Sequence, residues 1–158
     1  MNSLSPSAQK VQEALVGLGC TARVIEFLES THTAQEAAER AGCALGQIVK
    51  SLIFQGKTSF KPLLVLTSGM NRVNEELLGR HSGEPIRRPD AAFVRDVTGF
   101  AIGGVPPIGL SRPIETYLDQ DLTQYPTVWA AAGTPNAIFE IPPAELLRIT
   151  GARVIQVS

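Results

Sequence analysis

The stretch QIVKSLIFQGKTSFKPLLVLT, residues 47–67, predicts the centre of the fold. Residues 47–55 are rich in β-branched and apolar side chains, Gly56-Lys57 is typical of a turn, and residues 62–67 form a second apolar run. The segment therefore predicts two paired strands joined by a short loop. Lys50 and Ser51 interrupt the apolar pattern of the first strand.

Working outward from this hairpin, strands and short helices alternate irregularly. Thr33 and Glu36 form a capping box, which predicts a helix that ends near Gly42. This mixture favours an α/β (α+β) domain built on a mixed, curved sheet flanked by short helices. It argues against a doubly wound parallel fold. The expected strands are residues 22–28, 47–55, 62–67, 100–102, 114–118, 127–131, 137–141 and 153–157, and the expected helices start near Pro6, Thr33, Asn71, Pro89 and Pro142.

Length and composition set the broad class. The chain has 158 residues, 44% of them apolar and 18% charged, which predicts a single domain over residues 1–158 with a packed core. No apolar run approaches the roughly 20 residues that span a membrane, and residues 1–10 are polar, so we expect a cytoplasmic protein. Cys20 and Cys43 are expected to be reduced, and the spacing of His32 and His81 predicts no zinc site.

The net charge of −1 hides an uneven distribution. Residues 50–112 contain nine Lys and Arg against five acidic residues, a local charge of +4, which leaves −5 for the rest. A basic middle segment of this kind could meet phosphates. Scattered, solvated charges would give the same count, so both interpretations stay open.

Lys50 is the first candidate for chemistry. A charged group is costly to bury, so a lysine within an apolar strand needs a partner or a cleft. It could hold a phosphate or polarise a carbonyl. Alternatively, it points outward from an edge strand.

Two loops are the next candidates. Gly103 and Gly104, followed by Val105-Pro106-Pro107, would let another molecule approach the backbone closely, and the loop amides could bind an oxyanion. Neither a P-loop nor a dinucleotide-binding glycine pattern is present. The second loop, Gly133-Thr134-Pro135-Asn136, suits a hairpin and offers two polar side chains. Both loops could equally be ordinary connections.

The order of these segments resembles the YbaK/ProX family, the editing relatives of the insertion domain of prolyl-tRNA synthetases. The resemblance covers roughly residues 7–157. The matching stretches are QIVKSLIF (47–54), GFAIGGVPPIGL (99–110) and WAAAGTPNAIFEI (129–141), with support from THTAQEAAE (31–39) and TSGMNRVNEELL (67–78).

The resemblance implies a barrel-like editing-domain fold and a pocket for the aminoacylated 3′ end of tRNA. It implies Lys50, Gly103 and Gly104 as the catalytic residues. It also implies a set of residues around the substrate: Phe27, His32, Ser51, Gly133, Thr134, Pro135 and Asn136. The chain departs from Cys-specific members, which carry an aspartate at the position of Ile138, and from Ala-specific members, which have a histidine-bearing loop at residues 134–136.

The activity that follows is hydrolysis of the ester in mischarged tRNA carrying Ser, Thr, Ala, Cys or 2-aminobutyrate, with tRNA(Pro) among the carriers. We expect no cofactor and no metal, because positioning and backbone charge suffice for an activated ester. The expected partners are the CCA end and acceptor stem of tRNA, and an aminoacyl-tRNA synthetase. A noncatalytic tRNA- or nucleotide-binding protein that regulates a synthetase, or an enzyme acting on free amino-acid esters, remains an alternative.

Overall fold

The computed structural model describes residues 3–29, 31 and 33–158. Its strands are β1 (Val24–Glu26), β2 (Ile48–Gly56), β3 (Pro62–Ser68), β4 (Ile86–Arg87), β5 (Glu115–Asp119), β6 (Val128–Ala131), β7 (Ala137–Ile141) and β8 (Arg153–Ile155). Its α-helices are α1 (Pro6–Gly17), α2 (Ala34–Ala41), α3 (Glu75–Ser82), α4 (Ala91–Thr98) and α5 (Pro143–Thr150). Two 3₁₀ helices, η1 (Leu45–Gln47) and η2 (Gln120–Gln124), complete the described elements.

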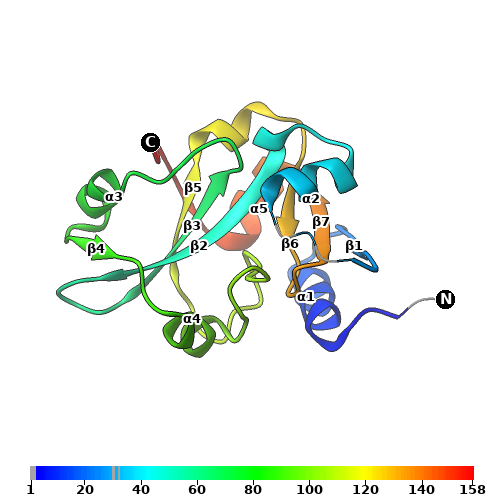
Figure 1. Cartoon of the computed structure of the whole chain (residues 1–158), viewed down its shortest axis with the longest axis horizontal. Helices are drawn as coiled ribbons and strands as arrows, with labels where there is room; N and C mark the ends of the chain where they lie inside the picture. The colour runs from blue at the N-terminus through cyan, green and yellow to red at the C-terminus, as the bar shows by residue number, and fades with distance from the viewer. Residues whose placement is uncertain (1–2, 30, 32) are drawn as a thin grey trace.

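Within the described residues, all strands belong to one mixed sheet with the order β1-β7-β6-β2-β3-β5-β8, and β4 pairs with β2 off this path. Short helices flank the sheet: α3 lies beyond β4 at one end, and α1 and α2 lie near β6 and β7 at the other (Figure 1). The expected mixed sheet with short flanking helices is therefore confirmed. No helix in the described part of the chain is long and apolar enough to cross a membrane.

The β2–β3 hairpin forms the middle of the sheet, as its sequence predicts. Its register pairs Lys50 with Thr67 and Ser51 with Leu66. Strand β3 is buried on both faces: Leu64 and Leu66 belong to the main core, and Leu63 belongs to a second core with Phe54. This double burial explains why β3 is a continuous apolar run, without the alternation of a half-exposed strand.

The other edge of β2 is paired only at its two ends. Parallel strand β6 pairs with β2 at Ile48 and Val49, and antiparallel strand β4 pairs with it at Gln55 and Gly56. Between them, residues 50–54 have no strand neighbour on this edge among the described residues. The sheet therefore opens along the part of β2 that contains Lys50 and Ser51.

The helix boundaries follow local capping rules, with some corrections to the expected positions. Thr33 caps α2 as predicted, its hydroxyl accepting a hydrogen bond from the Glu36 amide at 3.1 Å. The cap of α3 is Asn74 and not Asn71, because the Asn74 side chain accepts from the amide of Leu77. Helix α4 begins after Asp90, which caps it.

The strand predicted at residues 100–102 is wrong. Thr98 Oγ1 accepts a hydrogen bond from the Phe100 amide, and the amide of Gly104 donates to the carbonyl of Ala101. These local bonds use the backbone groups that a strand would pair with a neighbour. The segment is therefore a turn that leads into the glycine loop.

Candidate active site

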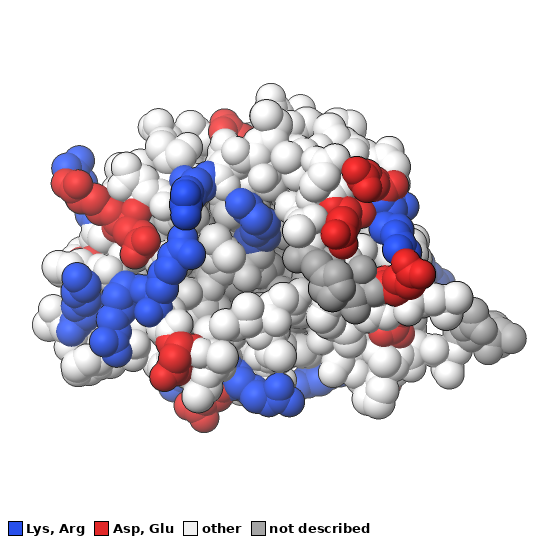
Figure 2. All heavy atoms as spheres, viewed as in Figure 1, with Lys and Arg blue, Asp and Glu red and all other residues white. Residues whose placement is uncertain are grey.

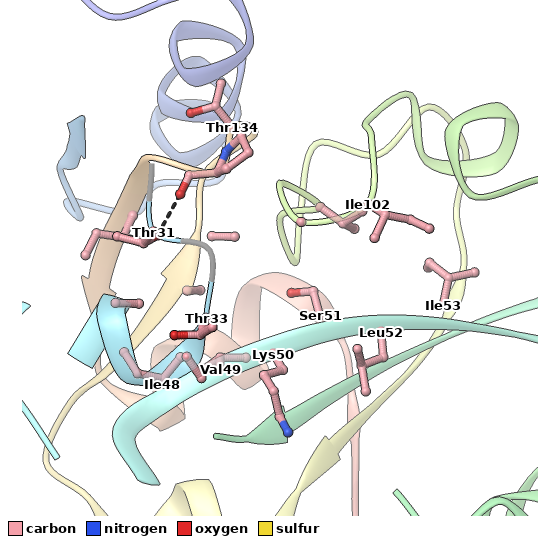
Figure 3. A pocket seen from close by; sticks show the side chains of 18 of the residues that line it. Thr31, Thr33, Ile48, Val49, Lys50, Ser51, Leu52, Ile53, Ile102 and Thr134 are labelled. Atoms are coloured by element: carbon pink, nitrogen blue, oxygen red, sulfur yellow. Dashed lines mark hydrogen bonds between the residues drawn. The ribbon is translucent and has the colours of Figure 1, made fainter. Parts of the chain in front are cut away.

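A cavity of about 420 Å³ lies along the open edge of β2. Its walls come from β2, α2, β6, the start of β7, the glycine loop at residues 102–105 and the loop at 134–135 (Figure 3). The cavity brings together five of the residues predicted from the sequence: Lys50, Ser51, Gly103, Thr134 and Pro135. Of the other predicted residues, Phe27, Gly104, Gly133 and Asn136 frame these walls, and His32 lies outside the described residues.

Ser51 is the most telling polar residue in the cavity. Its Oγ is buried and has no hydrogen-bond partner among the described residues. Figure 3 shows the Ser51 side chain rising from β2 into the space between Thr31 and Thr134 on one side and Ile102 on the other. Because a buried hydroxyl without a partner is unfavourable, this atom is poised to bond to a ligand.

The backbone of β2 adds further polar groups to the same wall. The Gly69 amide donates to the Ile48 carbonyl at 2.7 Å, so the backbone groups of Ile48 point toward β3. Backbone direction alternates along a strand, so those of Ser51 and Ile53 point toward the open edge. The cavity is therefore lined by unpaired amide and carbonyl groups next to the Ser51 hydroxyl.

Lys50 has its side chain on the opposite face of β2 from that of Ser51 (Figure 3). Its Nζ donates to the Asn71 carbonyl at 2.7 Å. The pKa of Lys50 is lowered from its ordinary value, mainly by burial and next by the positive charge of Arg72, while Asp119 opposes the shift. The Lys50 ammonium therefore lies on the other face of β2, next to Asn71, and not beside the Ser51 hydroxyl.

A buried network holds the Asn71 carbonyl in front of Lys50. Asp119 is almost fully buried, and its carboxylate accepts hydrogen bonds from the Thr67 hydroxyl, the Ser68 amide and the Asn71 side chain. A second bond links the Asn71 side chain to Asp121 at 2.7 Å. The buried Asp119 carboxylate therefore holds the turn that contains Asn71, and its acceptor oxygens are bonded within the protein.

Two arginines stand near Lys50. Arg88 lines the cavity, lies 5.9 Å from the Phe54 ring centre and forms a long ion pair with Glu75 at 3.5 Å. Arg72 is exposed, and its charge and that of Arg88 both lower the pKa of Lys50. Figure 2 shows a band of Lys and Arg side chains beside the hollow at the centre of this face, on the side of α3 and β4. An anion would relieve the repulsion among these cations.

The glycine loop lines the cavity with backbone amides that have no hydrogen-bond partner among the described residues, and that of Gly103 is one of them. Gly103 has a φ of 95°, which favours glycine, and its amide has no hydrogen-bond partner among the described residues. The Gly104 amide is used, because it donates to the Ala101 carbonyl at 3.1 Å. Of the two glycines predicted to be catalytic, only Gly103 therefore has an amide free to bind an oxyanion.

The loop at residues 133–136 is fixed by hydrogen bonds to the segment after β1. The amide of Phe27 donates to the Asn136 carbonyl at 2.7 Å, and the Asn136 side chain returns a bond to the Phe27 carbonyl. Thr31 donates to the Pro135 carbonyl through both its amide and its hydroxyl. The Phe27 backbone and both the carbonyl and the side-chain amide of Asn136 thus hold the wall in place. The Phe27 ring lies 5.8 Å from the Arg40 guanidinium.

Sequence reasoning missed several residues of this site: Thr31, Thr33, Arg88, Ile102 and the Asn71–Asp119 pair. One available signal was the alternation of strand side chains, which already predicts that Lys50 and Ser51 face opposite ways. Asp119 is the last residue of strand β5, but nothing local connects it to Asn71, which lies 48 positions earlier. Among the described residues, no three His, Cys, Asp or Glu side chains are grouped as around a metal ion.

Comparison with known proteins identifies this arrangement. A family model described as the aminoacyl-tRNA editing domain matches residues 29–149. The chain belongs to this family. The resemblance inferred from the sequence is confirmed, as is the enzyme class, a hydrolase acting on the ester of aminoacyl-tRNA.

Of three proteins similar to this chain, the names of two agree with the editing-domain family. A solved structure named as a candidate trans-editing enzyme for prolyl-tRNA synthetase has 50% sequence identity and a TM-score of 0.94, over 99% of each chain. The uncharacterized protein YwhH of Bacillus subtilis (strain 168) is 34% identical over 131 residues, 83% of each chain. EbsC of Enterococcus faecalis (strain ATCC 700802 / V583), named as a candidate Cys-tRNA(Pro)/Cys-tRNA(Cys) deacylase, is 26% identical over 80% of this chain and 77% of EbsC.

Proposed function

We propose that this editing domain hydrolyses the ester of mischarged tRNA carrying a small amino acid, with tRNA(Pro) among the carriers. The observation that carries the proposal is the pairing of two unsatisfied groups on one cavity, the buried Ser51 hydroxyl and the free Gly103 amide. Polar groups without partners in a largely apolar cavity mark where a polar ligand binds. An aminoacyl ester supplies both an ammonium and a carbonyl to meet them.

The walls of the cavity support a small side chain as the group removed. Five alanines line it, together with Ile48 and Ile138: Ala34, Ala37, Ala130, Ala131 and Ala137. Ile138 stands where Cys-specific relatives carry an aspartate, so this wall is apolar. A pocket of this kind separates residues that differ by one methylene by only about 1–3 kcal/mol, so we expect several of Ser, Thr, Ala, Cys and 2-aminobutyrate to be accepted.

The division of roles follows from the geometry of β2. The Gly103 amide stabilises the oxyanion that forms when water attacks the ester carbonyl. The Ser51 hydroxyl and the open backbone edge of β2 bind the aminoacyl group. The Lys50 side chain lies on the opposite face of β2 from Ser51, and Arg88 also lines the cavity. The Lys50 ammonium therefore binds a phosphate or the ribose of the CCA end and does not polarise the ester.

The water that attacks the ester needs a proton acceptor, and the free hydroxyl of the terminal ribose can serve as one. Hydrolysis of an activated ester needs no cofactor beyond this water. The band of cations beside the cavity adds affinity for the acceptor stem, which makes the KM for charged tRNA depend on salt. Charged tRNA is used in the cytoplasm, where we place the reaction, either free or with an aminoacyl-tRNA synthetase.

A deacylation panel tests the proposal. The protein is mixed with tRNA(Pro), and with one other tRNA, charged with Ser, Thr, Ala, Cys, 2-aminobutyrate or Pro. We expect release of one or more small residues, no release from Pro-tRNA(Pro), and loss of activity in Lys50→Ala. If no charged tRNA is hydrolysed although tRNA still binds, the noncatalytic alternative is correct.

A further inference from the structure

The carboxylate of Glu26, at the end of β1, accepts hydrogen bonds from two segments that are distant in the sequence, one at Ser5 and one at Thr134, and so forms a bridge between them. Its Oε1 accepts a hydrogen bond from the Ser5 amide at 2.7 Å, and its Oε2 accepts from the Ser5 hydroxyl at 2.6 Å. Oε2 also lies 3.3 Å from the Thr134 hydroxyl. Ser5 and Glu26 lie outside residues 29–149, which the family model matches, whereas Thr134 lies within them.

The Ser5 end of the bridge is rigid. Ser5 is the N-cap of α1, and this helix is anchored in the main core through Ala8, Val11 and Leu15, which are fully buried. The first turn of α1 also supports the loop directly: a Cβ at Gly133 would lie 2.7 Å from the Ser7 carbonyl oxygen. The start of α1 is therefore a fixed platform beneath the loop at residues 133–136.

The Thr134 end of the bridge belongs to the cavity wall. The Thr134 hydroxyl has one proton and two acceptors in reach, Glu26 Oε2 at 3.3 Å and Asn136 Oδ1 at 3.0 Å. Figure 3 shows this hydroxyl turned away from Ile102, so the loop backbone faces the cavity. The wall also touches the glycine loop, because a Cβ at Gly104 would lie 3.0 Å from the Thr134 Cα.

We infer that Glu26 is a positioning residue that sets the place of the Thr134 wall and, through it, the size of amino acid that the cavity accepts. The inference rests on the proposed function, because it assigns Thr134 to the amino-acid pocket. Glu26 does not line the cavity, and it acts only through Thr134. Burial opposes ionisation of Glu26, but the bonds from Ser5 and Thr134 outweigh it and hold the pKa of the carboxyl below its ordinary value, so the bridge is charged at neutral pH.

The consequence is a defined change in selectivity. Without the bridge, the wall keeps the backbone bonds of Gly133 and Pro135 but loses the tie between Thr134 and the start of α1. The Thr134 backbone can then shift, and the cavity gains room for one more methylene. The ratio of kcat/KM for Ala-tRNA to that for 2-aminobutyryl-tRNA should then fall several-fold, since a well-fitted apolar pocket separates such a pair by roughly tenfold or more. Loss of stability alone would lower both values without changing their ratio.

The experiment measures this ratio, together with Tm, in Glu26→Ala, Thr134→Val and the double variant. Glu13→Ala, an exposed glutamate on α1, is the matched control, and Thr134→Ser keeps the hydroxyl and should restore the wild-type ratio. We expect both single variants to lower the ratio and the double variant to lower it no further, because the two residues act through one bond.

An unchanged ratio in both single variants, with or without a lower Tm, would overturn the inference, as would multiplicative effects in the double variant. An inactive wild-type protein would instead remove the proposed function on which the inference rests. The two failures are therefore distinguished by the wild-type measurement in the same assay.

Discussion

The amide of Gly133 donates to the carbonyl of Gly104 at 2.9 Å, so the two loops that face each other across the cavity are joined through their backbones. A Cβ at Gly104 would lie 2.9 Å from the carbonyl carbon and oxygen of Gly133. The absence of a side chain at Gly104 is thus a condition for the contact, and the contact fixes the position of the neighbouring Gly103 in the cavity wall.

Gly104→Ala should separate the two loops. The clash is with backbone and cannot be relieved by a side-chain rotation, so we expect a loss of about 1–3 kcal/mol in the free energy of unfolding and a larger loss of kcat. Gly17→Ala is the control, because a Cβ there meets nothing within 4 Å, and it should be neutral or slightly stabilising. Chemical denaturation and deacylation rates measure both effects, and a Gly104→Ala protein with wild-type stability would refute the contact.

Asp119→Asn should weaken the hydrogen-bond network that positions the Asn71 carbonyl beside Lys50. The neutral amide replaces a buried carboxylate that accepts bonds from Thr67, Ser68 and Asn71, which costs about 1.5–3 kcal/mol of stability. The Asn71 carbonyl then no longer holds Lys50, and KM for charged tRNA should rise. Asp121→Asn, at an exposed position that also bonds to Asn71, is the matched control and should have a small effect. Equal effects of the two substitutions would show that burial of Asp119 is not what matters.

Lys50 should lose its positive charge at lower pH than an ordinary lysine. Its pKa is lowered by burial and by Arg72, so affinity for a phosphate should decline early as the solution becomes alkaline. The Kd for tRNA with the amino acid in amide linkage, which is not hydrolysed, reports this directly. Lys50→Arg keeps its charge and should show a flatter pH dependence. Parallel curves for the two proteins would mean that Lys50 does not contact the phosphate.

Glu26 should contribute stability that disappears in acid. Its folded-state pKa lies below the ordinary value of 4.5, so its hydrogen bonds stabilise the fold fully above that pH and are lost as the pH falls through the lowered pKa. The Tm difference between wild type and Glu26→Gln should therefore be largest near neutral pH and shrink in the acid range. If the Tm difference is constant across this range, the hydrogen bonds from Ser5 and Thr134 do not favour the ionised form of Glu26.

The sequence predicted most of the elements because their determinants are local. The β2–β3 hairpin follows from two apolar runs around Gly56-Lys57, and α2 follows from its Thr33 cap. Local signals also misled: Asn71 looks like a helix cap but bonds to Asp119, and residues 100–102 look like a strand but form a turn. Which of two polar residues caps a helix depends on partners that are distant in sequence.

The candidate site was predictable in outline and not in orientation. The residues of the two loops were found because glycine, proline and asparagine mark sharp turns. Glu26, in contrast, bonds to Ser5 and to Thr134, which lie 21 and 108 positions away in the sequence. Contacts between such distant residues produce no periodic pattern in the sequence from which they could be predicted.

The role of the Ser51 hydroxyl in hydrolysis is measured by the single-turnover rate on the best substrate of the panel, compared between wild type and Ser51→Ala. Removing a buried hydroxyl that has no protein partner should leave Tm unchanged or slightly higher. We expect a wild-type rate far above uncatalysed hydrolysis and a rate reduced about tenfold or more in Ser51→Ala. Equal rates for the two proteins, or a wild-type rate equal to that without protein, would contradict this expectation.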